Sequence, residues 1–204
     1  ADRANEPITG LQVERFDAVL AELTNAGFDP SLTHQANTAG TLNRPDSHRS
    51  MVRVGVGIYG VEPSPLLRSR YRELGLQPAV FLRSEVSYLQ VVGPGEGVGY
   101  GHHWTTLAVT HLAIVPIGYA DGIFRGWWES GEVLIGGRRR PIRGVVTMDS
   151  LIVEVDETVA VGDEVVLLGA QGDECLRAGE VGEVLGTIGY EVLTSLGARV
   201  PRRY

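Results

Sequence analysis

The sequence predicts an α/β segment over residues 1–75 and an all-β domain over residues 76–204. Two observations lead to this fold class. The first part carries a helical apolar face followed by short apolar stretches, and the second carries repeated β-branched runs separated by glycine-rich turns. With 204 residues, the chain is long enough for one large or two small domains.

The first expected element is an amphipathic helix near the N-terminus. Its apolar residues recur at the spacing of one helical face: Val13, Phe16, Val19, Leu20 and Leu23. Thr9, with Gln12 three residues later, is typical of a capping box at a helix start. Gly27 suits the position at which the helix ends.

Two strands and a short helix are expected next. Residues 31–36 form a strand candidate that ends at the turn-like residues 37–40. Valines and an isoleucine alternate with other residues over 52–58, which predicts a second strand. Residues 66–74 follow as a short helix. Helix, strand, loop and strand of this length form a piece of an α/β layer or barrel that is too small to be complete.

From about residue 76 the sequence predicts mainly strands. The β-branched runs lie at residues 84–92, 107–116, 132–135, 151–155 and 164–168. Short strands at this spacing, with turn signals between them, are typical of a barrel or a sandwich. A helix is expected near residues 177–185, and Arg138-Arg139-Arg140 after two glycines indicates a solvated hairpin tip.

Composition excludes several classes of function. The formal net charge of −7 argues against general binding to nucleic acid or to anionic membranes. Cys175 is the only cysteine, so an internal disulfide and a cysteine-rich zinc site are excluded, and His102-His103 has no further ligand at metal spacing. These residues therefore predict no metal site. No apolar run approaches about 20 residues and no signal-peptide pattern is present, which predicts a cytoplasmic protein.

Two tyrosines lie between glycines. Tyr100 belongs to Gly97-Val98-Gly99-Tyr100-Gly101, Tyr119 belongs to Ile117-Gly118-Tyr119-Ala120-Asp121-Gly122, and Thr147-Met148-Asp149 follows them. Flanking glycines let the backbone approach a ligand closely, although each segment alone also suits a rigid turn. In this order the three segments resemble the C-terminal domain of an alanine racemase, a pyridoxal-phosphate enzyme.

The resemblance extends through essentially the whole chain. It implies a partial (β/α) barrel over residues 1–75, containing the last strands and helices of a barrel that binds pyridoxal 5'-phosphate. A C-terminal β-barrel-like domain would then cover residues 76–204. It also implies the interconversion of L- and D-alanine, which supplies D-alanine for peptidoglycan. Enzymes of this family are homodimers in which each active site combines one subunit's barrel with the partner's β-domain.

A candidate anion site combines the end of the first expected strand with residues within the second. Thr38 offers a hydroxyl and Gly55 and Val56 offer backbone N–H groups, but these residues also suit an ordinary turn. The resemblance places Thr38 at the position of a phosphate-binding serine, and Gly55 and Val56 at two backbone phosphate contacts. Tyr190 would be a tyrosine that bonds the same phosphate.

Arg53 and His34 form the second candidate group. In the resemblance Arg53 faces the pyridine nitrogen of the cofactor, and His34 lies behind Arg53 and helps to orient it. An arginine remains protonated, so it donates to the ring nitrogen and leaves that nitrogen without a proton of its own. The ring is then a weaker electron sink, which restrains side reactions.

The resemblance assigns the remaining roles to the β-domain. Tyr100 would be one of two catalytic bases that remove or return the α-proton on opposite faces of the substrate. The backbone N–H of Met148 would meet the substrate carboxylate. Tyr119 and Arg125 would line the corridor that leads to the active site.

All 18 basic side chains are arginine, so the lysine that holds the cofactor and acts as the other base is absent. We therefore expect the chain to be the C-terminal part of such an enzyme and to be inactive alone. An N-terminal barrel portion carrying the lysine would complete it. The alternatives are a catalytically silent β-domain that binds a partner and a racemase for a related amino acid such as serine.

Overall fold

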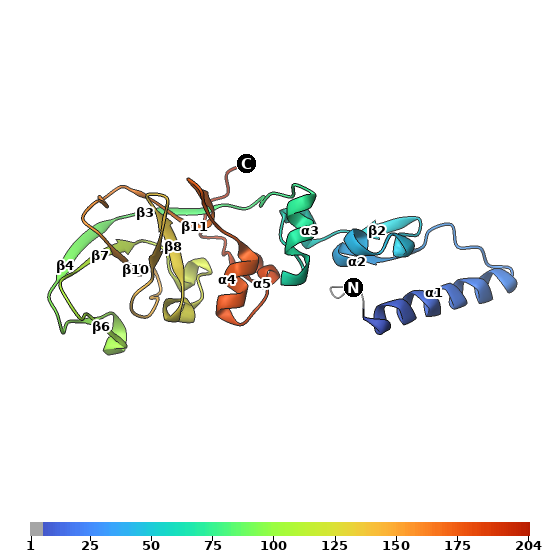
Figure 1. The fold of residues 1–204 in the computed structure, drawn as a ribbon, viewed down its shortest axis with the longest axis horizontal. Helices are drawn as coiled ribbons and strands as arrows, with labels where there is room; N and C mark the ends of the chain where they lie inside the picture. The colour runs from blue at the N-terminus through green and yellow to red at the C-terminus, as the bar shows by residue number, and fades with distance from the viewer. Residues whose placement is uncertain (1–5) are drawn as a thin grey trace. The chain divides into compact units, whose positions relative to one another are not determined.

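The computed structural model describes residues 6–204, which divide into two compact units (Figure 1). The first unit extends to Ala79 and the second is Val80–Tyr204. In the described part of the chain, no helix has the length and apolar character that crossing a membrane requires.

The first unit contains helices and one pair of strands. Its elements are α1 (Pro7–Asn25), β1 (His34–Asn37), α2 (Thr38–Asn43), η1 (Pro45–Ser47), β2 (Met51–Arg53), η2 (Val56–Tyr59), η3 (Pro65–Leu67) and α3 (Arg68–Glu73), where η denotes a 3-10 helix. β1 and β2 pair in parallel, which requires the intervening helical connection. Ala39, Leu67 and Tyr71 form a small core between α2 and α3.

Helix α1 begins before the predicted capping box. Pro7 occupies the first turn, where the missing N–H of proline has no partner to lose, and Glu6 precedes it in an extended conformation. Thr9 therefore lies buried inside the helix rather than at its cap, so the capping-box prediction is wrong. The predicted end is confirmed: Gly27 has φ +84°, and Phe28 N–H donates to the Leu23 carbonyl at 2.9 Å.

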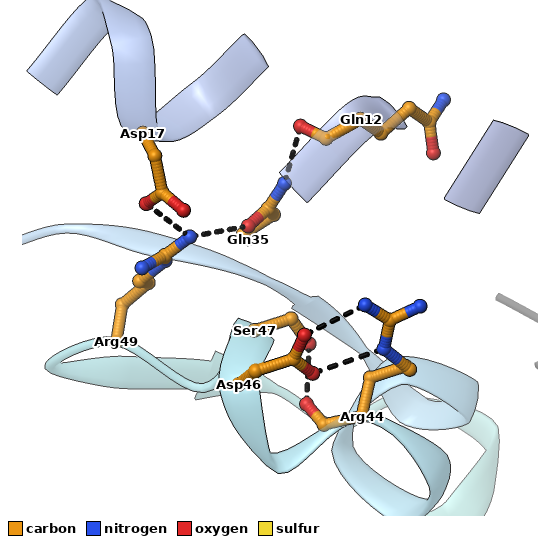
Figure 2. Close-up of polar contacts among 7 residues, drawn as sticks. All are labelled: Gln12, Asp17, Gln35, Arg44, Asp46, Ser47 and Arg49. Carbon is orange, nitrogen blue, oxygen red and sulfur yellow. Dashed lines mark hydrogen bonds and ion pairs between the residues drawn. The ribbon is translucent and has the colours of Figure 1, made fainter. Parts of the chain in front are cut away.

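Polar contacts connect α1 to β1 and to the turn before β2 (Figure 2). Gln35 Nε2 on β1 donates to the Gln12 carbonyl at 2.9 Å, and Arg49 Nη2 lies 2.6 Å from Asp17 Oδ1. The Arg49 guanidinium also lies 5.4 Å from the centre of the Phe16 ring. Several apolar side chains of α1 remain exposed: Ile8, Leu11, Val19 and Leu23.

The second strand is shorter than its alternating sequence predicts. β2 ends at Arg53, and residues 56–59 form the 3-10 helix η2, in which Val56 is buried and Ile58 is exposed. Gly57 lies against Thr38: a Cβ added at Gly57 would come within 2.7 Å of Thr38 Cγ2. Glycines at 55, 57 and 60 permit this turn, and the apolar alternation across them does not continue the strand.

Residues 38–43 also differ from the predicted loop, because they form helix α2. Asn37 caps this helix: its Oδ1 accepts a hydrogen bond from Gly40 N–H at 2.9 Å. The turn-forming composition of residues 37–40 therefore marks a helix start that directly follows β1.

The second unit consists mainly of strands. They are β3 (Leu82–Glu85), β4 (Tyr88–Val92), β5 (Gly97–Val98), β6 (Trp104–Thr105), β7 (Thr110–Val115), β8 (Glu132–Ile135), β9 (Arg138–Pro141), β10 (Leu151–Val155), β11 (Glu164–Gln171) and β12 (Glu174–Leu176). The predicted runs 132–135, 151–155 and 164–168 are strands throughout. The run 84–92 divides into β3 and β4, and the run 107–116 is a strand only over residues 110–115. Three short 3-10 helices interrupt them: η4 (Tyr100–His102), η5 (Tyr119–Asp121) and η6 (Arg125–Glu129).

The strands form several antiparallel sheets rather than one continuous closed barrel in the described residues. One sheet has the order β10-β7-β4, and another has the order β12-β11-β8-β9 with β3 also on β11. Residues 82–92 take part in both sheets, because β3 pairs with β11 and β4 pairs with β7. A bridge between Ile142 and Val153 provides a second link. The almost completely buried side chains include Val133, Leu134, Ile135, Leu151, Val153, Val165, Val166 and Leu167.

Two helices follow the strands. α4 (Ala178–Leu185) lies where the sequence predicts a helix, whereas α5 (Gly189–Ser195) was not expected. A Cβ on Gly182 would come within 2.8 Å of the Ile188 carbonyl carbon, so the two helices meet closely at this glycine. The short sequence of α5 does not predict a helix, and α5 is helical where it packs against α4.

The three arginines after Gly136-Gly137 differ in their exposure to solvent. Both glycines have positive φ and make the turn, while residues 138–141 form β9. Arg139 contacts three carboxylates, of Glu132, Glu174 and Glu180. The predicted hairpin is therefore confirmed, and Arg138 at its turn is solvated, with its side chain 71% exposed. Arg139 and Arg140 are instead partly buried in ion pairs, so the prediction of a solvated tip is wrong for these two residues.

Candidate functional site

In the first unit, Thr38 and Gly55 meet where β1 passes into α2 and where the chain leaves β2. Thr38 Oγ1 accepts a hydrogen bond from Gly55 N–H at 3.1 Å. Thr38 is buried, whereas Gly55 is exposed and Val56 follows it as the first residue of η2. The structure thus brings together three of the residues predicted to bind an anion, with a hydroxyl and backbone N–H groups as donors.

Arg53 and His34 are in direct contact on the same pair of strands. Arg53 Nη1 lies 2.5 Å from His34 Nδ1. A guanidinium keeps its protons, so Arg53 donates and His34 Nδ1 accepts, which assigns the imidazole proton to Nε2. The expected contact between these side chains is present, and it restricts the orientation of Arg53.

Tyr100 lies in the second unit on an exposed turn. Tyr100 is 75% exposed, and Gly99 and Gly101 on either side have φ of +71° and +73°. A residue with a side chain rarely adopts such φ values, so both glycines are needed for this turn. A Cβ on Gly99 would lie 3.6 Å from the Val145 backbone nitrogen. The turn therefore packs against the segment that leads to Met148.

Tyr119 and Met148 lie on two neighbouring loops that are joined through their backbones. Tyr119 N–H donates to the Thr147 carbonyl and Ala120 N–H donates to the Met148 carbonyl, both at 2.9 Å. Tyr119 is 43% exposed and Met148 is 52% exposed. The three quoted motifs of the β-domain are thus neighbours in space, with the segment of residues 144–148 lying between the two tyrosine turns.

Arg125 and Tyr190 lie elsewhere in the second unit. Arg125 is exposed at the start of η6, and Tyr190 is partly exposed on α5. Tyr190 and Thr38, both predicted to bind the same phosphate, belong to different units. Their shared role stays a prediction.

Two aspartates and an arginine that sequence reasoning did not assign to the site connect these loops. Arg199 Nη2 donates to Asp149 Oδ1 at 2.7 Å, and Arg199 Nε lies 3.2 Å from Asp121 Oδ1. The hydrogen bond to Asp149 and the charge of Asp121 raise the pKa of Arg199. Both aspartates lie within the quoted motifs, but nothing local in the sequence indicates that a distant arginine meets them.

In residues 6–204, no three histidine, cysteine or acidic side chains are grouped to hold a metal ion. The ring of His103 instead packs against Trp128, with ring centres 5.9 Å apart. In the first unit the candidate polar groups are the Thr38 hydroxyl, backbone N–H groups and the Arg53 guanidinium, and in the second unit they include the phenols of Tyr100 and Tyr119.

Comparison with protein families identifies both parts of the chain. Residues 1–63 match the alanine racemase N-terminal domain, and residues 79–204 match the alanine racemase C-terminal domain. The alanine racemase of Frankia casuarinae is 44% identical over the whole chain, and that of Symbiobacterium thermophilum is 42% identical. The chain covers 53% and 54% of these two relatives, so it spans about half the length of the curated relatives it matches.

Solved structures of alanine racemases share the fold. The enzyme of Streptomyces lavendulae is 41% identical with a TM-score of 0.93, and the match covers all of this chain and 53% of that one. The Bacillus anthracis structure, which holds bound L-Ala-P, is 38% identical with a TM-score of 0.86, and 98% of this chain and 52% of that one are covered. The chain therefore belongs to the alanine racemase family.

Proposed function

We propose that this chain supplies the C-terminal half of an alanine racemase that depends on pyridoxal 5'-phosphate. The observation that carries the proposal is the match of both parts of the chain to the family, at about 40% identity to several racemases. In this proposal residues 1–75 contribute the end of the cofactor-binding barrel, and residues 76–204 form the C-terminal β-domain.

The residues of the first unit fit the proposed cofactor. The Gly55 N–H, which donates to Thr38 Oγ1 at 3.1 Å, would donate to the phosphate instead when the cofactor binds. The Thr38 hydroxyl, the Val56 N–H and Tyr190 would bind the same phosphate. Arg53 would face the ring nitrogen. The bound cofactor supplies an electron sink that stabilises negative charge at the substrate α-carbon. The donor set therefore suits both ends of this molecule.

Arg53 and His34 adjust how strongly that sink acts. His34 Nδ1 accepts from Arg53 Nη1 and leaves other guanidinium N–H groups of Arg53 available as donors. Because a guanidinium does not release its proton at neutral pH, Arg53 would hold a hydrogen bond to a ring nitrogen without protonating it. His34 would orient Arg53 for this contact.

Tyr100 would exchange a proton with the substrate α-carbon. Its phenol is exposed on a turn fixed by Gly99 and Gly101, as a side chain that acts on a molecule bound by another subunit needs to be. The Met148 N–H would bind the substrate carboxylate, and Tyr119 and Arg125 would line the approach to the site. In the homodimer that we propose, Tyr100 and Met148 serve the partner's cofactor, and Thr38, Arg53 and Tyr190 serve their own.

The chain has no lysine to hold the cofactor or to act as the second base. We propose that an N-terminal barrel portion carries this lysine and that the chain is inactive without it. The proposed reaction places the assembled protein in the cytoplasm, where it would supply D-alanine for peptidoglycan.

Reconstitution tests the proposal directly. The 204-residue chain is mixed or coexpressed with the N-terminal half of the Frankia casuarinae relative and with pyridoxal 5'-phosphate, and conversion of L-alanine to D-alanine is measured. We expect no conversion by either half alone, conversion by the pair, and loss of conversion with Tyr100→Phe. Intact mass after borohydride reduction should show one pyridoxyl-phosphate adduct on the N-terminal half.

Other outcomes distinguish the alternatives. If the two halves assemble but convert no amino acid, the proposed racemase activity is contradicted. This outcome favours a non-catalytic β-domain that only binds a partner. Faster conversion of serine than of alanine indicates a racemase of related specificity. Racemisation by the pure chain alone contradicts the role assigned to the missing lysine.

A further inference from the structure

Three segments that are distant in the sequence meet around Asp121 in the second unit. Residues 118–122 bind residues 147–148 through the backbone bonds of Tyr119 and Ala120. Residues 195–199 bind the same turn from another side: Ser195 Oγ donates to the Gly122 carbonyl at 2.9 Å, and Gly197 N–H donates to the Asp121 carbonyl at 3.0 Å. The C-terminal segment thus contacts the turn that carries Tyr119.

Arg199 is the residue of this segment that reaches both loops. Its Nε lies 3.2 Å from Asp121 Oδ1, and its Nη2 donates to Asp149 Oδ1 at 2.7 Å. The side chain of Asp121 is only 11% exposed, and its other oxygen accepts from Gly118 N–H at 2.9 Å. Arg199 therefore balances a nearly buried negative charge and at the same time connects it to the residue that follows Met148.

We propose that Arg199 is a positioning residue for substrate binding, because it joins the Tyr119 turn to the Met148 loop through Asp121 and Asp149. This inference rests on the proposed function, in which Met148 N–H meets the substrate carboxylate. The backbone bond from Ala120 N–H to the Met148 carbonyl holds one side of this loop. Arg199 holds the other side through Asp149, and a planar guanidinium can bridge two carboxylates whereas an ammonium is a single point charge.

A loop that holds the substrate carboxylate acts on the ground state and on the transition state alike. Loosening such a loop raises KM and leaves kcat nearly unchanged. A general loss of folding would instead reduce the amount of active enzyme and lower the apparent kcat. The split between KM and kcat therefore separates positioning from a merely structural role.

The kinetic test uses the reconstituted pair of halves with this chain carrying Arg199→Gln. We expect KM for alanine to rise about three- to fivefold, the range that one partly exposed ion pair supports, with kcat within about twofold. Arg199→Lys keeps the charge but not the bridge and should give an intermediate KM. Arg83→Gln removes another exposed ion pair of the same unit, to Glu164 at 2.9 Å, and should leave KM unchanged.

A double substitution tests whether Arg199 acts on KM through Asp149. Asp149→Asn alone should raise KM by no more than Arg199→Gln, which also removes the contact with Asp121. Adding Asp149→Asn to Arg199→Gln should raise KM no further, because Arg199→Gln has already removed the contact with Asp149. Additive effects would contradict the proposal. Equal changes in KM with Arg83→Gln, or an unchanged KM with Arg199→Gln, would also overturn it.

Hydrogen exchange tests the inference without any activity. In the 204-residue chain alone, Arg199→Gln should speed exchange at the amides of Tyr119 and Ala120 about three- to fivefold, since the loop that accepts their hydrogen bonds is less restrained. Arg83→Gln should not change these amides. Unchanged exchange with Arg199→Gln overturns the positioning role even if the pair is active. An inactive wild-type pair with the expected exchange pattern overturns the proposed function alone.

Discussion

Arg53 Nη1 lies 2.5 Å from His34 Nδ1, and this contact crosses the parallel strands β1 and β2 close to Thr38. It fixes two properties at once: the tautomer of His34 and the direction of the Arg53 guanidinium. His34 needs an unprotonated Nδ1 to accept, and Arg53 has no form that could accept in return. In this pair Arg53 is therefore always the donor and His34 the acceptor, and the positive charge stays on Arg53.

Replacing His34 tests this arrangement. His34→Ala removes the acceptor and should lower kcat/KM of the reconstituted pair about tenfold, the effect of one hydrogen bond to a charged group. His34→Gln offers a carbonyl oxygen in place of Nδ1 and should restore part of the activity. His48→Ala provides the control, because His48 also loses one hydrogen bond, between its Nε2 and the Thr41 carbonyl at 2.8 Å, without contacting Arg53. Equal effects of the two alanine variants would contradict the orienting role.

The sequence predicted contacts that lie on adjacent strands better than contacts between distant loops. His34 and Arg53 belong to consecutive strands, and the strand runs of the second unit are marked by β-branched residues between glycine-rich turns. Arg199, Asp121 and Asp149 meet only because the C-terminal segment returns to both loops. No local pattern encodes such a meeting, so this part of the site needed the structure.

Errors at element boundaries have a similar cause. The alternation over residues 52–58 has the period of a strand, but glycines within it allow the chain to turn at residue 55. α5 has seven residues, too few for its own sequence to predict a helix, and it is helical in contact with α4. In both places tertiary packing decides what the local pattern leaves open.

Arg139 should contribute more to stability than an exposed arginine. Its guanidinium contacts Glu174 at 2.8 Å, Glu180 at 2.5 Å and Glu132 at 3.3 Å. These hydrogen bonds raise the pKa of Arg139 and connect β9 to β8, to β12 and to α4. Arg139→Gln leaves the carboxylates near one another without their shared cation, and like charges repel.

We expect Arg139→Gln to lower the free energy of unfolding by about 1–3 kcal/mol, measured by urea denaturation. Arg83→Gln should lower it by less than about 1 kcal/mol, because that ion pair is exposed. Adding Glu180→Gln to Arg139→Gln should recover part of the loss by removing one repelling charge. The same loss with Arg83→Gln as with Arg139→Gln would contradict a special role for the cluster.

Asp156 should make the free energy of unfolding depend on pH in the acidic range. The hydroxyl of Thr158, and after it Arg140 at 2.7 Å, lower the pKa of Asp156 from 3.8 to about 2. A carboxyl with a lowered pKa in the folded state contributes stability above its unfolded pKa, and this contribution is lost as the pH falls through the folded pKa. The loss should therefore occur between about pH 4 and pH 2.

Thr158→Ala removes the largest cause of the shift and should raise the pKa of Asp156, measured by carboxyl NMR titration. The difference in unfolding free energy between wild type and Thr158→Ala should be constant above pH 4 and should shrink as the pH approaches 2. Arg140→Gln should raise the pKa by less than Thr158→Ala does. A difference in stability that does not change with pH would show that Thr158 acts through something other than this carboxylate.

Gly118 determines how closely the Tyr119 turn approaches the Met148 loop. A Cβ at this position would lie 2.5 Å from the Met148 carbonyl oxygen and also too close to the Thr147 carbonyl oxygen. The φ of Gly118 is −147°, which other residues also adopt, so the obstacle is the neighbouring backbone alone. Gly126→Ala is the matched control, because a Cβ at Gly126 would meet nothing within 4 Å.

We expect Gly118→Ala to lower the free energy of unfolding by about 1–3 kcal/mol, as overpacking against rigid backbone does, whereas Gly126→Ala should change it by less than about 1 kcal/mol. Amides of Tyr119 and Ala120 should exchange faster in Gly118→Ala, because their acceptors on the Met148 loop are pushed away. If Gly118→Ala unfolds and exchanges as Gly126→Ala does, the two loops are free to separate. Close backbone contact would then not be what sets the position of Met148.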